Sequence, residues 1–286
     1  MLETNHWPWP VQAERSRAAA PAGKEGLPMI LPHRVEGSGD GLAVLMVHPL
    51  GADQTFWDEC RKHFGPGILT VSCDLRGSGN SPDLAEPLTL DSTVDDLETL
   101  RQYLGLERLA VMGCAVGAMA ATAYAARYGG RTAALVASNP GFRVTPEGAA
   151  NLRERSELVR SSSMAALLPG AIENAFVGFA DTRARHDYEA RFLRQRPENY
   201  AFAALGAAEA DISGCGAAIS CPVLLVVGRN DRLFGIAHAT PMATAIPQAE
   251  LVEFPEGAHF IPYQQPREFG ATVSAFLTRN GLARQR

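Results

Sequence analysis

The sequence predicts an α/β fold built on a mainly parallel, doubly wound sheet, and three observations lead to this prediction. Short apolar runs, typical of strands buried on both faces of a sheet, recur along the chain. Segments with helical periodicity separate most of these runs, as in proteins whose parallel strands are joined by helices. The length of 286 residues and a hydrophobic content of 46% suffice for one large domain or for a core with an inserted sub-domain.

The expected strands share apolar side chains and end in loops rich in Gly, Pro, Asn or Asp. We place them at residues 29–35, 42–47, 68–73, 109–112, 132–137, 222–227 and 250–254.

The expected helices alternate with these strands. Residues 90–104 illustrate the pattern, because apolar side chains recur there at helical spacing and Asp residues occupy the positive first turn. We place helices at residues 56–59, 90–104, 116–127, 237–246 and 265–278.

Residues 143–212 differ from the rest of the chain, since Arg and Glu become frequent, helix formers dominate and no strand pattern appears. We interpret this stretch as a helical cap inserted between the two parts of the core, residues 28–142 and 213–286. Residues 1–27 carry Trp-Pro-Trp-Pro and scattered charge without periodicity, and we expect a flexible extension.

Composition excludes several classes of protein. A net charge of −5 without a basic stripe argues against a nucleic-acid partner, and no apolar run is long enough to span a membrane. The five cysteines have neither disulfide-framework nor zinc spacing, and no nicotinamide, flavin or phosphate-binding motif is present. We expect a cytoplasmic protein without a secretory signal, cofactor or metal, which acts on a small molecule.

The stretch 108–120 carries the clearest chemical signal, because an apolar strand runs into a tight turn and then into an Ala-rich helix. Gly113 and Gly117 bracket the turn in a Gly-x-X-x-Gly pattern, which is the context of a nucleophile elbow. Small residues are required there because strand and helix nearly touch. The central position, where Ser, Cys or Asp is expected, holds Ala115.

Two further loops supply acid–base groups, and functional groups of open α/β sheets gather at the carboxyl ends of strands. Asp231 follows one predicted strand and His259 follows the next. The order of nucleophile position, acid and histidine is the triad order of a known hydrolase fold.

Taken together, these motifs resemble the α/β-hydrolase superfamily. The matching segments span residues 40–280 and occur in the family's order: His-Pro-Leu-Gly (48–51), Asp-Leu-Arg-Gly-Ser-Gly-Asn-Ser (74–81), Gly-Cys-Ala-Val-Gly (113–117), Gly-Arg-Asn-Asp (228–231) and Gly-Ala-His-Phe (257–260). Within the superfamily, the cap stretch 144–148 and the Phe56-Trp57 segment resemble the 3-oxoadipate enol-lactonase group.

The resemblance implies a role for each matching residue. His259 would act as general base and acid, and Asp231 would orient its imidazole. The backbone N–H groups of Leu50 and Val116 would form an oxyanion hole. The chain departs from the family at Pro49, where Gly is usual, and at Ala115, where the family has Ser.

Four interpretations of Ala115 are open at this point. In the first, His259 and Asp231 would deprotonate water or substrate without a covalent intermediate, and in the second Cys114 would serve as the nucleophile. Alternatively, the chain is a non-catalytic ligand binder or a nucleophile-knockout trap, or another hydroxyl such as that of Ser138 replaces the missing one.

Other candidates concern substrate binding. Trp57, Phe142 and Cys114 are expected near an apolar pocket below the cap. We interpret His48 as structural and both His186 and His238 as surface residues. Cap arginines would receive substrate carboxylates if any lies in the pocket, the candidates being Arg143, Arg153, Arg155, Arg183 and Arg185.

Overall fold

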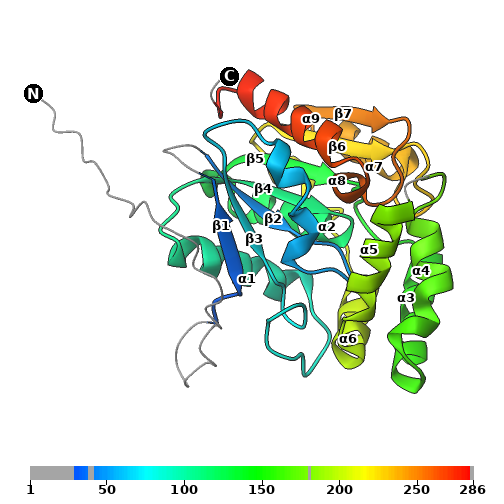
Figure 1. Ribbon diagram of the computed structural model, residues 1–286. Coiled ribbons are helices and arrows are strands. Elements are labelled where there is room, and N and C mark those ends of the chain that lie inside the picture. Colours follow the sequence, from blue (N-terminus) through cyan, green and yellow to red (C-terminus); the bar gives the residue numbers. More distant parts are fainter. Residues whose placement is uncertain (1–28, 38–41, 180–181, 284–286) are drawn as a thin grey trace, which may run out of the picture.

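The computed structural model describes residues 29–37, 42–179 and 182–283 (Figure 1). The extension expected over residues 1–27 lies outside the described residues. None of the described helices is both long and apolar enough to cross a membrane.

A seven-stranded sheet with the order β1-β3-β2-β4-β5-β6-β7 forms the centre of the described fold. All neighbouring pairs are parallel except β1 with β3, so the prediction of a mainly parallel α/β sheet is confirmed. The strands are β1 (His33–Glu36), β2 (Ala43–Val47), β3 (Leu69–Cys73), β4 (Leu109–Cys114), β5 (Thr132–Ser138), β6 (Val223–Gly228) and β7 (Ala249–Phe254).

Helices cover both faces of this sheet, because successive strand side chains point to opposite sides. One face packs against α1 (Leu90–Tyr103), α2 (Val116–Arg127) and α7 (Ile236–Ala245). The other face packs against α8 (Ile261–Gln264), α9 (Pro266–Arg279) and two short 3₁₀ helices, Gln54–Trp57 and Cys60–His63. The doubly wound arrangement is therefore present.

In the described part of the chain, four α-helices lie between β5 and β6 and gather to one side of the sheet in Figure 1. Their positions fall within the stretch 143–212, which we call the cap. They are α3 (Pro146–Ser161), α4 (Leu168–Ala175), α5 (Thr182–Leu193) and α6 (Pro197–Ala208). An isolated antiparallel bridge between Arg143 and Asp211 brings the two ends of this insertion together.

The first strand differs from the sequence-based expectation. A strand over 29–35 was predicted, whereas β1 begins at His33 and runs antiparallel to β3. Pro32 lies just before it and accepts a hydrogen bond from the N–H of Asp74 at 2.8 Å. Edge strands of otherwise parallel sheets are often antiparallel, and apolar periodicity does not encode strand direction.

Candidate active site

The turn between β4 and α2 has the backbone of a nucleophile elbow. Ala115 adopts a φ of 52° and a ψ of −120°, which is an unfavourable conformation for a residue with a Cβ. A Cβ on Gly113 would lie 2.1 Å from the carbonyl oxygen of Gly117, and one on Gly117 would lie 2.4 Å from that of Val47. The two glycines therefore let α2 approach β4 and β2, as the motif requires.

Strand register brings the remaining loops to this elbow. Val47 pairs with Gly113, so the loop after β2 lies beside the turn that holds Ala115. Gly228 pairs with Phe254, so the loops that follow β6 and β7 emerge together. Parallel pairing thus places the elbow, Asp231 and His259 at one edge of the sheet.

His259 and Asp231 form a buried pair. The Nδ1 atom of His259 lies 2.9 Å from Oδ2 of Asp231, and both residues are more than nine-tenths buried. The other carboxylate oxygen, Oδ1, accepts hydrogen bonds from the N–H groups of Leu233 and Phe234, at 2.8 and 3.1 Å. Burial alone would raise the pKa of Asp231, but the charge and hydrogen bond of His259, together with these N–H groups, lower it to about 2.

An ionised Asp231 fixes the tautomer of its partner. A carboxylate only accepts hydrogen bonds, so Nδ1 of His259 carries the proton that it donates to Asp231. The Nε2 atom of a neutral imidazole then has a free lone pair and can take a proton.

Asn139 supports this pair, and sequence reasoning missed it. Its Nδ2 group donates to Oδ2 of Asp231 at 2.8 Å and lies 2.9 Å from the carbonyl oxygen of Ala258, while its Oδ1 accepts from Ser138. Asn139 has a positive φ of 52°, which Asn tolerates better than most residues. The only signal in the sequence is its place directly after β5, at the same edge of the sheet.

His48 has the structural role expected for it. The ring is almost fully buried, with Nδ1 2.9 Å from the carbonyl oxygen of Pro49 and Nε2 accepting from the N–H of Leu75 at 3.1 Å. Burial lowers the pKa of His48, which favours the neutral ring that this pattern requires. His48 therefore ties the loop that carries Leu50 to the loop after β3.

A cavity of about 150 Å³ lies between this edge of the sheet and the cap. Four of the residues predicted for the site line it: Leu50, Ala115, Val116 and His259. Asp231 lies behind His259, away from the wall. Most of the remaining lining is apolar or aromatic, with contributions from Ile172, Tyr188, Phe192, Tyr200, Leu233, Phe234 and Phe260.

The backbone donors proposed for the oxyanion hole are available. Val116 is the first residue of α2, so its N–H has no carbonyl partner within the helix. Among the described residues, no hydrogen bond uses the N–H of Leu50 or that of Val116. Because Leu50 and Val116 line the same cavity, both donors are positioned to serve one bound group.

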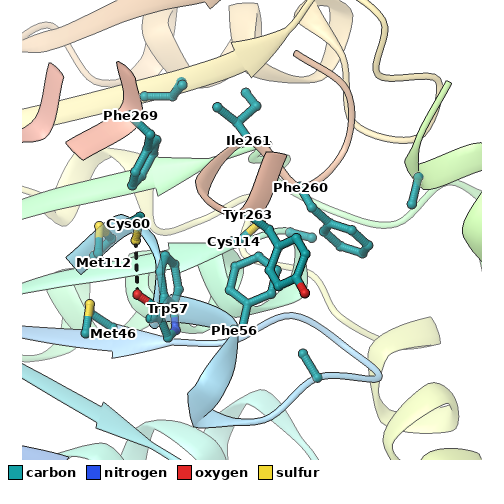
Figure 2. Close-up of a cluster of buried hydrophobic side chains, with 14 of the residues drawn as sticks. Met46, Phe56, Trp57, Cys60, Met112, Cys114, Phe260, Ile261, Tyr263 and Phe269 are labelled. Carbon is teal, nitrogen blue, oxygen red and sulfur yellow. Dashed lines mark hydrogen bonds between the residues drawn. The ribbon is translucent and has the colours of Figure 1, made fainter. Parts of the chain in front are cut away.

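Three residues predicted to bind substrate, Trp57, Cys114 and Phe142, are not among the described residues that line this cavity. Trp57 is fully buried beside Phe56 on the α9 face of the sheet (Figure 2). Cys114 is also fully buried, with its sulfur 3.7 Å from the carbonyl oxygen of His259. Phe142 packs on the opposite face of the sheet, next to Gly216.

The same geometry bears on the alternative nucleophiles. Burial raises the pKa of the Cys114 thiol well above its usual range, so the reactive thiolate is disfavoured. The hydroxyl of Ser138 is fully buried and donates to Asn139 at 2.8 Å. Neither group reaches the cavity in this conformation.

Several lining residues carry polar groups that sequence reasoning did not single out. Asn151 and Arg155 come from α3, one helical turn apart, and His238 comes from α7. His238 had been interpreted as a surface residue. The sequence had grouped Arg155 with four other cap arginines, and only tertiary packing distinguishes it. Among the described residues, no group of His, Cys, Asp and Glu is arranged to hold a metal ion.

Comparison with known proteins identifies the family to which the fold belongs. The family model described as the alpha/beta hydrolase fold matches residues 43–266. A protein of Caulobacter sp. (strain K31) that carries the name carbamate hydrolase RutD is 29% identical, over 86% of this chain and 95% of its own. The 3-oxoadipate enol-lactonase 2 of Acinetobacter baylyi is 24% identical, over 85% of this chain and 91% of its own.

Solved structures give the same result. A thermophilic esterase from Thermogutta terrifontis superposes with a TM-score of 0.82 at 29% identity, covering 94% of this chain and 99% of its own. The enol-lactonase from Burkholderia xenovorans LB400 has a TM-score of 0.79 at 25% identity, covering 87% of this chain and 96% of its own. The matched segment includes the elbow, Asp231 and His259, and the chain belongs to the α/β-hydrolase fold family.

Proposed function

We propose that this chain is a hydrolase of a small ester, enol-lactone or carbamate-like carbonyl compound, and that it works without a covalent intermediate. The observation that carries the proposal is the intact His259–Asp231 pair, which meets a cavity whose elbow holds Ala115 instead of a nucleophile. The relatives named as an esterase, an enol-lactonase and a carbamate hydrolase support the substrate class.

The proposed reaction begins with water held near Ala115, where a serine hydroxyl would otherwise lie. Nε2 of His259 takes one proton from the water as its oxygen attacks the substrate carbonyl carbon. Asp231 stabilises the imidazolium that forms, and its low pKa keeps it ionised throughout. The imidazolium then returns the proton to the leaving oxygen or nitrogen as that bond breaks, so protons and charge balance.

The developing oxyanion would be bound by two backbone donors, the N–H groups of Leu50 and Val116. Donors that are already oriented stabilise charge in the transition state at little reorganisation cost. The loop that carries Leu50 is held by His48, whose two ring nitrogens both bond to backbone groups. Loss of the nucleophile in a comparable triad leaves about 10³–10⁴-fold acceleration over water, so slow turnover is expected.

The test compares three proteins on a panel of small esters, enol-lactones and carbamates: the unmodified chain, Ala115→Ser and Cys114→Ala. We expect slow turnover by the unmodified chain, unchanged turnover by Cys114→Ala and much faster turnover by Ala115→Ser. A loss of turnover in Cys114→Ala would instead make the thiol the nucleophile.

A ligand-binding protein without catalysis is the second candidate, and Ala115 favours it because its side chain offers no nucleophile where the elbow meets the cavity. In that case the unmodified chain would bind a panel compound without hydrolysing it. Absence of turnover in the unmodified chain, with tight binding retained, would therefore replace the hydrolase proposal by this one.

A further inference from the structure

Arg155 carries the one permanent charge among the described side chains that line the cavity. The lining also contains His238 and His259, and no Asp or Glu side chain from the described residues. A cavity of this size with a mostly apolar wall takes a ligand with few polar groups, and the positive charge of Arg155 favours a ligand that bears a negative charge.

The side chain of Arg155 makes no ion pair or hydrogen bond with any residue that the structure describes. Five other cap arginines are each paired with a carboxylate: Arg153 with Glu209, Arg160 with Glu198, Arg185 with Glu189, Arg191 with Asp187, and Arg196 with Asp83. Arg155 as a whole is half-buried and lines the cavity, where no described residue pairs with its charge.

The charge of Arg155 acts on the wall around it. Burial raises the pKa of the Tyr188 and Tyr200 hydroxyls, and the nearby positive charge of Arg155 opposes that rise at both. Both tyrosines line the cavity, so the positive charge of Arg155 affects groups on the cavity wall.

The position of Arg155 separates it from the reacting groups along the chain and in the fold. It belongs to α3 in the cap, with Asn151 one turn earlier, whereas His259 lies in the loop after β7 and Val116 begins α2. A ligand that spans the cavity would therefore meet the acid–base pair on one wall and a guanidinium on the other.

We propose that Arg155 binds a carboxylate of the substrate, so that the cavity selects small esters or lactones that carry a carboxylate away from the reacting carbonyl. This inference rests on the proposed function for the reacting end of the substrate. A guanidinium pairs with a carboxylate through two parallel hydrogen bonds, which fixes orientation as well as charge. Arg155 would thus act as a specificity-determining residue that positions the carbonyl at His259.

The experiment measures calorimetric binding of two compounds that differ in one charge, monomethyl glutarate and dimethyl glutarate. The proteins are the unmodified chain, Arg155→Gln and Arg155→Lys. Arg153→Gln is the control, since Arg153 lies two residues away on α3 and already pairs with Glu209. Hydrolysis of both esters is followed in parallel to separate KM from kcat.

We expect the unmodified chain and Arg153→Gln to bind the monoanion about tenfold or more tightly than the neutral diester. Arg155→Gln should lose this preference because its affinity for the monoanion falls, while its affinity for the diester stays unchanged. Arg155→Lys should retain part of the preference for the monoanion. In hydrolysis, the change should appear mainly in KM.

Equal binding of the two compounds by the unmodified chain, a preference that survives in Arg155→Gln, or no binding of the monoanion would each overturn the inference. The proposed function fails separately. Binding that depends on Arg155 but is not followed by hydrolysis would support the carboxylate subsite and contradict the proposed hydrolase function. Hydrolysis without a preference for the monoanion would contradict the subsite and leave the proposed function standing.

Discussion

At the scale of single residues, Ala115 has the positive φ of a nucleophile position although its side chain carries no nucleophilic group. A positive φ in a residue with a Cβ costs on the order of 1–3 kcal/mol and persists only where the surroundings enforce it. Here the Ala115 N–H donates to the carbonyl oxygen of Ser138 at 2.9 Å, and its own carbonyl oxygen accepts from Ala118. These backbone hydrogen bonds therefore maintain the conformation of the elbow without any contribution from a nucleophilic side chain.

This strain can be measured by Ala115→Gly. Glycine adopts the same backbone angles without a Cβ penalty, so the free energy of unfolding should rise by about 1 kcal/mol despite the more flexible unfolded chain. Ala121→Gly, in the buried interior of α2, should instead lower it by about 1 kcal/mol or more. Denaturant unfolding checks both, and a destabilised Ala115→Gly would show that the elbow is not strained.

At the scale of elements, the site depends on how closely α2 packs on the sheet. Gly117 lies against the backbone carbonyl oxygens of Val47 and His48, which cannot move aside as a flexible side chain would. The contact sets the position of Val116 relative to Leu50, and so the spacing of the two proposed oxyanion donors.

Gly117→Ala should therefore damage both stability and site. Its Cβ would lie 2.4 Å from the Val47 oxygen, and we expect a loss of about 1–3 kcal/mol in the free energy of unfolding, with weaker ligand binding. Gly130→Ala is the matched control, because a Cβ there meets nothing within 4 Å. If both variants unfold at the same denaturant concentration, the close approach is not needed for stability.

At the scale of the whole molecule, stability is expected to fall in acid. The Glu98 carboxylate accepts hydrogen bonds from Arg101 and Gln102 within α1 and from Tyr124, and the last of these joins α1 to α2. The hydrogen bond from Arg101 makes the largest contribution and lowers the pKa of Glu98 to about 2, the same value as for Asp231. A carboxyl with a lowered folded-state pKa stabilises the protein above its unfolded pKa and loses that contribution as pH falls through the folded one.

Glu98→Gln tests this acid dependence. The variant should be less stable than the unmodified chain at pH 7, and the difference should shrink between about pH 4.5 and pH 2, where Glu98 becomes protonated. Thermal unfolding across this range, with the exposed Glu154→Gln as control, provides the measurement. A difference that stays constant down to pH 2 would contradict the assigned role of this carboxylate.

Much of the fold could be predicted from the sequence, because its signals are local. The helix over 116–127 begins and ends at the expected residues, and the buried strands shift by only one or two positions. Chain order then brings Ala115, Asp231 and His259 to one sheet edge. By contrast, the direction and shorter length of β1 depend on pairing with β3, for which an apolar pattern gives no information.

The site is less predictable where it depends on tertiary packing. Trp57 and Phe142 have the composition of pocket residues, yet they pack on opposite faces of the sheet. Asn139 and Arg155 belong to common residue types in ordinary positions, and only the fold brings them to Asp231 and to the cavity.

The central claim is that His259, oriented by Asp231, activates water in a site without a nucleophile. The most direct measurement is the hydrolysis rate of the best panel ester by the unmodified chain and by His259→Ala, with His186→Ala, an exposed cap histidine, as control. The account predicts that His259→Ala loses the measurable rate and that His186→Ala keeps it. An unchanged rate in His259→Ala would contradict the account, because the water would then be activated by another group.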